Sequence, residues 1–399
     1  MPDLGKFSPL YPEDRVLGPL RETAARLATE CHRLAGQASA PVARALRPRL
    51  RAMNSYYSNK IEGEHTKPAA IEQALQKHFD ADQDLAKKQR LAVAHMEAEE
   101  LVEQKAGEAQ AHDLFSPGFI KEIHAILYGK LPNADRYSDD ARPIVPGAYR
   151  RDEVYAGRHL APPFGEVEEL VRGWSERYRA LQGTESLLIG VACAHHRLAW
   201  IHPFIDGNGR SARLHSHAVL HAMGLTHGFW SPMRGLARTR EQYYARLADA
   251  DLPRRNDVDG RGALSQEELV AFARYFLETC LDQVVFMRAQ LDLASLKDRL
   301  RTLLLDLGAR PWQIGSEKSL VKTEALEALH YVVMAGALER ARFIAMTGLG
   351  ERTGRRVLAS LIDYGLLVAE SHRGPVSFAV PMASLRFLFP NLWPEVETD

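Results

Sequence analysis

The stretch that decides the fold of this chain is His202-Pro-Phe-Ile-Asp-Gly-Asn-Gly-Arg-Ser-Ala-Arg213. Gly207 and Gly209 flank an asparagine, so consecutive backbone N–H groups can turn toward one point. The apolar residues that follow, Leu214 to Leu220, predict a helix whose N-terminal dipole adds positive charge at the same point. The stretch therefore predicts a loop and a helix start that bind an anion.

Charged side chains in this stretch favour a polyphosphate over a single carboxylate. Arg210 and Arg213 lie three residues apart, so both guanidinium groups project from the first helical turn toward phosphate oxygens. Asp206 supplies an oxygen ligand where a Mg²⁺ ion that bridges two phosphates needs one. His202 can take a proton from an attacking hydroxyl group at neutral pH. The alternative, an ordinary glycine-rich turn with surface charges, explains fewer of these residue types.

The same residues resemble the signature of the Fic family, His-x-Phe-x-Asp/Glu-Gly-Asn-Gly-Arg-x-x-Arg. The matching positions are His202, Phe204, Asp206, Gly207, Asn208, Gly209, Arg210 and Arg213. A chance match has a probability on the order of 10⁻¹⁰ per start site at average residue usage. The resemblance implies a helical fold and transfer of AMP from ATP, with Mg²⁺, to a Ser, Thr or Tyr hydroxyl of a target protein. It implies His202 as the base, Asp206 on the metal, and ATP contacts from Gly207, Asn208, Gly209, Arg210 and Arg213.

Other donors stay open. The kinase-like Doc branch has lysine where this chain has Gly209, which speaks against that chemistry. Relatives that transfer UMP or phosphocholine share the motif. Tyr243 and Tyr244 resemble an aromatic pair near the adenine in family members, although tyrosines at the start of a helix more often pack in a core.

A second motif, Ser58-Asn-Lys-Ile-Glu62-Gly63, ends a helix that apolar periodicity predicts over residues 41–61, with Gly63 as its stop. Ser58 and Glu62 lie one turn apart on the flank of the buried face. The segment resembles the inhibitory Ser/Thr-x-x-x-Glu-Gly motif of Fic proteins. This implies that Glu62 pairs with Arg213 and takes the place of the ATP γ-phosphate. A solvated Glu62, or a Glu62 that orients water for removal of AMP, are the alternatives.

Residues 141–163 are rich in Pro, Gly and Arg and predict a hairpin or flap, with β-like pieces around Val154. The segment resembles the target-docking hairpin of the family, which implies that Arg150 and Val154 belong to a surface where a target segment adds as an extra strand. The target's identity depends on this surface, which the motifs do not encode. Self-modification is a further candidate reaction.

The whole chain predicts a mainly α protein in three parts. These are an N-terminal helical region with the inhibitory motif over 1–105, a Fic helical core with a small β-hairpin flap over 106–295, and a winged helix-turn-helix over 310–399. Ser116 and Pro117 predict one helix start in the core. Ser265 and Glu268 predict a capping box at another.

The C-terminal part predicts helices over 341–347 and 357–362, followed by a hairpin wing around His372. Arg352, Arg355 and Arg356 can meet phosphates. Acidic and basic residues from position 320 onward are nearly equal in number, however, which argues for weak or no DNA affinity. A rival hypothesis is a transcription regulator that binds DNA through this part and only senses ATP. Packing or a homodimer contact is another role for it.

Composition places the chain among soluble globular proteins. Hydrophobic residues make up 46% and charged residues 26%, and 51 basic residues balance 51 acidic ones, so no global field favours nucleic acid or an anionic membrane. Widely spaced Cys31, Cys193 and Cys280 predict buried thiols rather than disulfides. The start lacks a basic flank and an apolar core, and no long apolar span follows, so we expect a cytoplasmic protein.

Histidines gather near the main motif. His217 and His221 stand four residues apart and can chelate a metal ion from one helical face. An HExxH motif or a cysteine partner does not accompany them, which disfavours a structural zinc site on sequence grounds.

Overall fold

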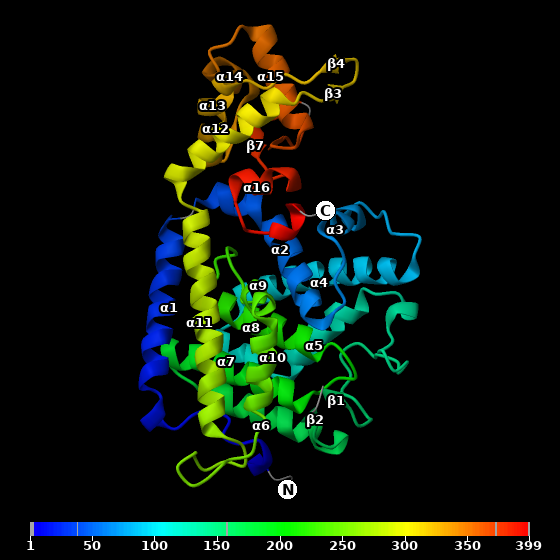
Figure 1. Ribbon diagram of the computed structural model, residues 1–399, viewed down its shortest axis with the longest axis vertical. Helices are drawn as coiled ribbons and strands as arrows, with labels where there is room; N and C mark the ends of the chain where they lie inside the picture. Colours follow the sequence, from blue (N-terminus) through cyan, green and yellow to red (C-terminus); the bar gives the residue numbers. More distant parts are fainter. Residues whose placement is uncertain (1–3, 38, 157–158, 372, 398–399) are drawn as a thin grey trace. The chain divides into compact units, whose positions relative to one another are not determined.

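The computed structural model describes residues 4–37, 39–156, 159–371 and 373–397. Helices dominate, so the mainly α prediction is confirmed (Figure 1). The chain divides into two compact units, one made of residues 1–32 and 51–285 and the other of 33–50 and 286–399. Three helices continue from one unit into the other: α1 (Gly18–Gln37), α2 (Ala40–Glu62) and α11 (Gln266–Gln290). The division into three parts stays a prediction.

The larger unit is built around α8 (Asn208–Ala222), which packs against α4 (Gln83–Glu108), α5 (Pro117–Gly129) and α7 (Thr184–Ile201). The other helices of this unit are α3 (Pro68–Leu75), α6 (Val167–Arg179), α9 (Met233–Arg238) and α10 (Arg240–Asp249). Every residue of α8 from Arg210 to Leu220 is buried. Buried polar groups need partners inside the protein, so the arginines and histidines of α8 fix side chains on the neighbouring helices.

Local sequence signals set most helix ends. Gly63, with φ of 82°, follows the end of α2 as predicted. Ser116 Oγ accepts a hydrogen bond from the Phe119 N–H at 3.2 Å and caps α5. At α11, Ser265 Oγ accepts from the Glu268 N–H at 3.2 Å. The second half of that predicted capping box is wrong.

The predicted capping box fails in this half because Arg255 competes for the Glu268 carboxylate. The Glu268 carboxylate pairs with the guanidinium group of Arg255, and the Ser265 N–H donates instead to the Leu252 carbonyl at 2.9 Å. The three cysteines are free and buried, as predicted.

The predicted hairpin is present between residues 141 and 163. Strand β1 (Tyr155–Ala156) pairs antiparallel with β2 (His159–Leu160). Gly157 and Arg158 of this segment lie outside the described residues.

The smaller unit contains α12 (Leu293–Ala309), α13 (Leu326–Ala335), α14 (Arg340–Met346), α15 (Glu351–Asp363) and α16 (Leu385–Leu388). Strands β3 (Gln313–Ile314) and β4 (Glu317–Lys318) form one pair. Strand β7 (Val376–Phe378) lies between β5 (Ala337–Leu338) and β6 (Leu367–Val368) in an antiparallel sheet. This element order supports the winged helix-turn-helix, which stays a prediction. His372 of the predicted wing lies outside the described residues.

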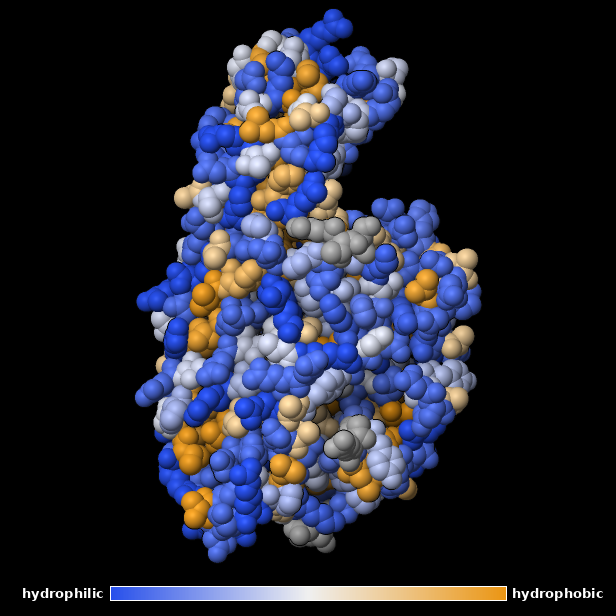
Figure 2. All heavy atoms as spheres, in the orientation of Figure 1, coloured by the Kyte–Doolittle hydropathy of each residue, from blue (hydrophilic) through white to orange (hydrophobic). Residues whose placement is uncertain are grey.

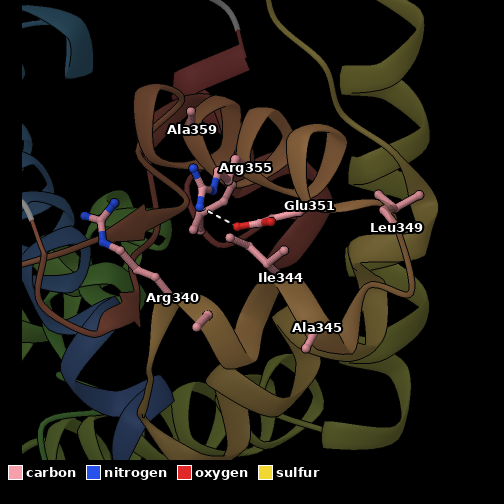
Figure 3. Close-up of a pocket in the computed structure, with 9 residues that line it drawn as sticks. Arg340, Ile344, Ala345, Leu349, Glu351, Arg355 and Ala359 are labelled. Carbon is pink, nitrogen blue, oxygen red and sulfur yellow. Dashed lines mark hydrogen bonds and ion pairs between the residues drawn. The ribbon is translucent and has the colours of Figure 1, made fainter.

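A hollow of about 580 Å³ is lined by residues of α14 and α15, among them Arg340, Ile344 and Arg355 (Figure 3). Arg355 is paired with Glu351 across one helical turn. Arg356 is likewise paired with Glu317 at 3.0 Å. Two of the three arginines predicted to meet phosphates are thus already paired with carboxylates, and DNA binding by this part stays a prediction.

The surface view shows mostly hydrophilic side chains with scattered apolar ones on this face (Figure 2). Such scattering is ordinary for proteins that bury most of their apolar residues. Among the described residues, every helix is too short or too polar to cross a bilayer.

Candidate functional site

His202 follows the last residue of α7 in a left-handed conformation, with φ of 50°. Its carbonyl accepts a hydrogen bond from Arg150 Nε at 2.8 Å, and its Nδ1 lies 3.2 Å from the Ala199 carbonyl. A carbonyl oxygen only accepts, so Nδ1 carries the proton and Nε2 is the basic nitrogen. Burial lowers the pKa of His202 to about 4. The ring is therefore neutral at pH 7, the state a general base requires.

Asn208 holds the turn between α7 and α8 in shape. Its side-chain oxygen accepts from the Phe204 N–H and its amide group donates to the Phe204 carbonyl, both at 2.9 Å. The Phe204 ring is buried and stacks on His124 with ring centroids 3.9 Å apart. Gly207 has φ of 77°, a conformation that favours glycine. The family resemblance predicts that Asn208 contacts ATP. In the structure its side chain stabilises the loop instead. Its backbone N–H belongs to the first turn of α8, where N–H groups have no partner within the helix.

Asp206 stands at the centre of a polar network below this turn. Its Oδ2 accepts from the Tyr128 hydroxyl at 2.9 Å and from Arg210 Nη2 at 3.0 Å, and its Oδ1 accepts from the Gly207 N–H at 2.6 Å. Burial acts to raise the pKa of Asp206, but the Arg210 charge and these hydrogen bonds keep it below its usual value. The Asp206 side chain is 39% exposed. It is thus an ionised carboxylate with access to solvent, as a Mg²⁺ ligand must be.

Arg213 faces α2. Its Nε donates to Ser58 Oγ at 3.0 Å, and its Nη2 donates to the Ser58 carbonyl at 3.0 Å and to Glu62 Oε1 at 2.5 Å. The Arg213 side chain is 1% exposed and that of Glu62 is 28% exposed. A methyl group built on Gly209 would overlap the Glu62 carboxylate. The carboxylate therefore lies directly on the glycine turn, where the sequence predicts an anion.

One cavity of about 710 Å³, which we call the site cavity, brings several of these residues together, but Asp206 and Arg210 are not among its lining residues. Its lining includes Glu62, His202, Asn208, Gly209, Arg213, Tyr155, Tyr243 and Tyr244. Tyr243 is buried and its hydroxyl lies 2.7 Å from His195 Nε2. Tyr244 is 41% exposed, and its hydroxyl donates to the Ile61 carbonyl at 2.8 Å. Both predicted tyrosines thus line the cavity, and Tyr244 also binds the end of α2.

The two flap residues that were predicted to contact a target are buried, whereas other residues of the flap are exposed. Arg150 and Val154 are both 3% exposed. Arg150 donates to the carbonyls of His202 and Pro162, so it holds the flap against the loop that begins at His202. Tyr155 and Leu160, in β1 and β2, are 72% and 55% exposed. Two apolar side chains of the hairpin therefore face solvent.

Helix packing brings Tyr128 and His124 to the site, and the sequence analysis did not identify either residue. Tyr128 lies in the apolar stripe of α5, yet its hydroxyl accepts from Arg210 Nη2 at 2.8 Å and donates to Asp206. Burial raises the pKa of Tyr128 well above its usual value, so the hydroxyl stays protonated. His124, one turn earlier, donates from Nε2 to the Asp206 carbonyl at 3.1 Å. The sequence offers little signal for either residue, because both fit an ordinary core helix.

Comparisons with known proteins agree with this geometry. The Fic/DOC family profile matches residues 114–220. Curated relatives called protein adenylyltransferase Fic are 34% identical over 126 residues in Drosophila mojavensis and 36% identical over 127 residues in Drosophila persimilis. Each alignment covers 31% of this chain and only 24% or 22% of the relative. The chain therefore spans about a quarter of the length of these relatives.

Two solved structures share the fold. Fic-1 from C. elegans has a TM-score of 0.52 and 20% identity, covering 68% of this chain and 73% of that chain. A Fic domain containing signaling protein from Bacteroides thetaiotaomicron has a TM-score of 0.50 and 18% identity, covering 67% and 95%.

Proposed function

Since residues 114–220 form a Fic domain, we propose that this protein transfers AMP from ATP to a hydroxyl group of a target protein. The observation that carries the proposal is the shared site cavity. A neutral His202, the open start of α8 at Gly209 and the buried Arg213 line one cavity of about 710 Å³. That size lies in the range of small-molecule and cofactor pockets.

In the proposed reaction, His202 Nε2 takes the proton of the target hydroxyl. The oxygen forms a bond to the α-phosphorus of ATP, the bond from that phosphorus to the bridging oxygen breaks, and pyrophosphate leaves. Backbone N–H groups at the start of α8 stabilise charge on the α-phosphate oxygens. The cavity contributes by orienting the two reactants, which supplies much of the rate.

Mg²⁺ fits the carboxylate of Asp206, which is ionised and partly exposed. When bound, the ion would neutralise charge on the phosphates. Tyr128 and Arg210 hold the Asp206 carboxylate in place. Arg210 itself is buried, so its role in the proposal is to position Asp206 as well as to attract phosphate.

We further propose that Glu62 holds the enzyme off at rest. Its carboxylate takes a hydrogen bond of Arg213 and lies on Gly209, where a nucleotide phosphate would bind. ATP and Glu62 are both anionic, so they compete for the same positive group. Ser58 supports this state, because its hydroxyl and carbonyl accept further hydrogen bonds from Arg213.

The exposed Tyr155 and Leu160 favour the flap as the surface where the target segment binds. A short edge strand beside an active site can accept an extended peptide by strand addition.

The test uses the full chain with Glu62→Gly, ATP labelled at the α-phosphate and a cell lysate as the source of targets. We expect labelled proteins, and mass spectrometry should find AMP on Ser, Thr or Tyr. The matched control is the double variant Glu62→Gly with His202→Ala, which should label nothing. A parallel panel of UTP and CDP-choline identifies the donor. Labelling from one of those and none from ATP would overturn the proposed donor, and no labelling from any would overturn the proposed activity.

A further inference from the structure

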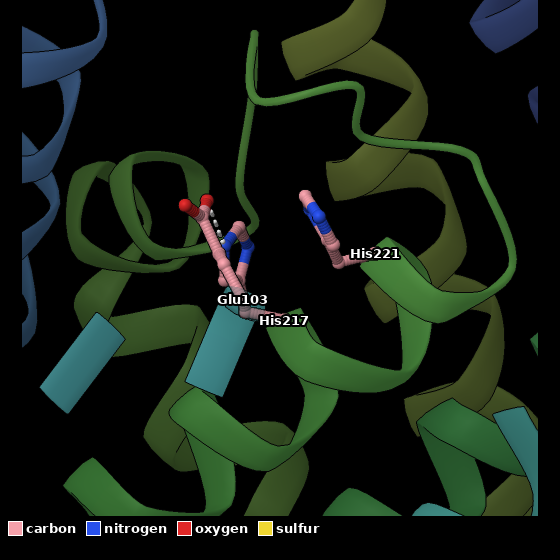
Figure 4. A group of neighbouring side chains, drawn as sticks. All are labelled: Glu103, His217 and His221. Carbon is pink, nitrogen blue, oxygen red and sulfur yellow. Dashed lines mark hydrogen bonds and ion pairs between the residues drawn. The ribbon is translucent and has the colours of Figure 1, made fainter. Parts of the chain in front are cut away.

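Three side chains outside the site cavity form a cluster with metal-ligand chemistry: Glu103 on α4, and His217 and His221 on α8 (Figure 4). Their ligand atoms all lie within 4.8 Å of one another. The sequence shows only the histidine pair, with no nearby cysteine or HExxH motif. The packing of α4 on α8 supplies the carboxylate that this pair lacks.

The spacing within the cluster suits a coordination shell. His217 Nε2 lies 3.1 Å from Glu103 Oε1. Two N or O ligands that each bind one zinc ion at about 2.1 Å in tetrahedral geometry lie roughly 3.4 Å apart. The Glu103–His217 pair therefore already has close to the length of one edge of such a shell. His221 follows one helical turn later and faces the same cluster.

The surroundings also favour a cation. Glu99, one turn before Glu103 on α4, is buried, and its Oε2 has no hydrogen-bond partner among the described residues. His217 is buried too, and its Nδ1 is without a partner in the same described part of the chain. Arg51 pairs with Glu103 at 2.7 Å, and Asn54 Nδ2 donates to Glu99 Oε1 at 2.8 Å. Two buried carboxylates thus lie beside Arg51 and the imidazole of His217, and a bound cation would add to the groups that offset their charge.

Outer contacts hold the ligands in place. Thr226 Oγ1 lies 2.8 Å from His221 Nδ1 and fixes the plane of that ring. Arg51 fixes the Glu103 carboxylate from the side away from His217. Such second contacts are usual around metal-binding histidines and carboxylates.

We propose that Glu103, His217 and His221 bind one divalent transition-metal ion of the Zn²⁺ class, with water completing its coordination. Two imidazoles and one carboxylate suit Zn²⁺, whereas Mg²⁺ and Ca²⁺ prefer oxygen ligands alone. The proposed metal site is separate from Asp206, so metal binding there can be tested independently of the proposed AMP transfer. The bound ion would link α4 to α8 one helical turn after Arg213.

The test measures Zn²⁺ binding to the full chain, free of any affinity tag and stripped with a chelator. Competition against a chromophoric chelator should give one Zn²⁺ per chain, and Co²⁺ should give the absorption spectrum of a tetrahedral site. His221→Ala removes a half-buried ligand and should weaken Zn²⁺ binding by roughly 100-fold or more. His112→Ala, at a partly exposed histidine outside the cluster, is the matched control and should bind as the wild type does.

Two more variants keep the result unambiguous. Glu103→Gln should also weaken Zn²⁺ binding, and Asp206→Ala should leave it unchanged, because Asp206 belongs to the other site. Zn²⁺ should raise the melting temperature of the wild type and not that of His221→Ala. Equal Zn²⁺ affinity in the wild type and His221→Ala, or no Zn²⁺ bound by the wild type, would overturn the proposal and leave Glu103–His217 as a buried ion pair.

Discussion

Replacing Glu62 by glycine removes the carboxylate that binds Arg213 at 2.5 Å. A hydrogen bond to a charged group contributes about 1.5–3 kcal/mol. Solvent reaches 28% of the Glu62 side chain and screens part of this interaction, so the lower part of that range, about 1.5–2 kcal/mol, applies. An incoming ATP phosphate must replace this interaction before it can bind Arg213. We therefore expect the dissociation constant for Mg²⁺-ATP to fall roughly 10- to 30-fold in Glu62→Gly.

Calorimetry measures that affinity, and the initial rate of labelled AMP incorporation at low ATP should rise by a similar factor. Glu62→Gln keeps the size of the side chain and removes its charge, so it should give an intermediate rise. Glu108→Gly removes an exposed carboxylate at the last residue of α4, as Glu62 is the last residue of α2, and should leave both quantities within about twofold. If Glu62→Gly folds normally and binds ATP no more tightly than the wild type, competition between Glu62 and the nucleotide is refuted.

Three further outcomes follow from the same contacts. Burial lowers the pKa of His202 to about 4, and only the neutral ring is a base, so the rate of Glu62→Gly should stay level from about pH 8 to about pH 6 and fall as the pH approaches 4. A midpoint near the ordinary histidine value of about 6.5 in its pH–rate profile would contradict this. Tyr244→Phe removes the hydrogen bond to the Ile61 carbonyl, worth about 0.5–1.5 kcal/mol, and should raise AMP incorporation by the otherwise wild-type chain about two- to tenfold; an unchanged rate would show that Tyr244 does not hold α2. Arg150→Met leaves the carbonyls of His202 and Pro162 without their donor and should lower the free energy of unfolding in urea by about 2–4 kcal/mol, whereas a loss below about 1 kcal/mol would mean that solvent replaces these bonds.

Local signals in the sequence were enough for the parts of the fold that depend on near neighbours. Gly63 after α2, Ser116 before α5 and the glycine turn at Gly207 were all predicted, because caps and turns are set within a few residues. The capping box at Ser265 failed in one half, since the distant Arg255 took the Glu268 carboxylate. That failure marks the limit of local rules.

The contact of Glu62 was predicted from the sequence, whereas the exposure of the flap residues was not. The resemblance implied that Glu62 pairs with Arg213, and the structure has the two groups in contact. The flap was also expected, but not that Arg150 and Val154 would be buried while Tyr155 and Leu160 face solvent. In so short a hairpin, alternation along the sequence gives too few residues to assign the two faces.

The sequence by itself determined the helical class, the glycine turn before α8 and the chemical types of the residues at the candidate site, because these depend on residue identity and close spacing. Only the tertiary structure decided that Tyr128 joins Asp206 to Arg210 and that Glu103 meets His217. The physical reason is that α8 is buried along most of its length, so its polar side chains must find partners on whichever helices pack against it. Those partners lie about 80 to 115 positions away in the chain, beyond the reach of any local pattern.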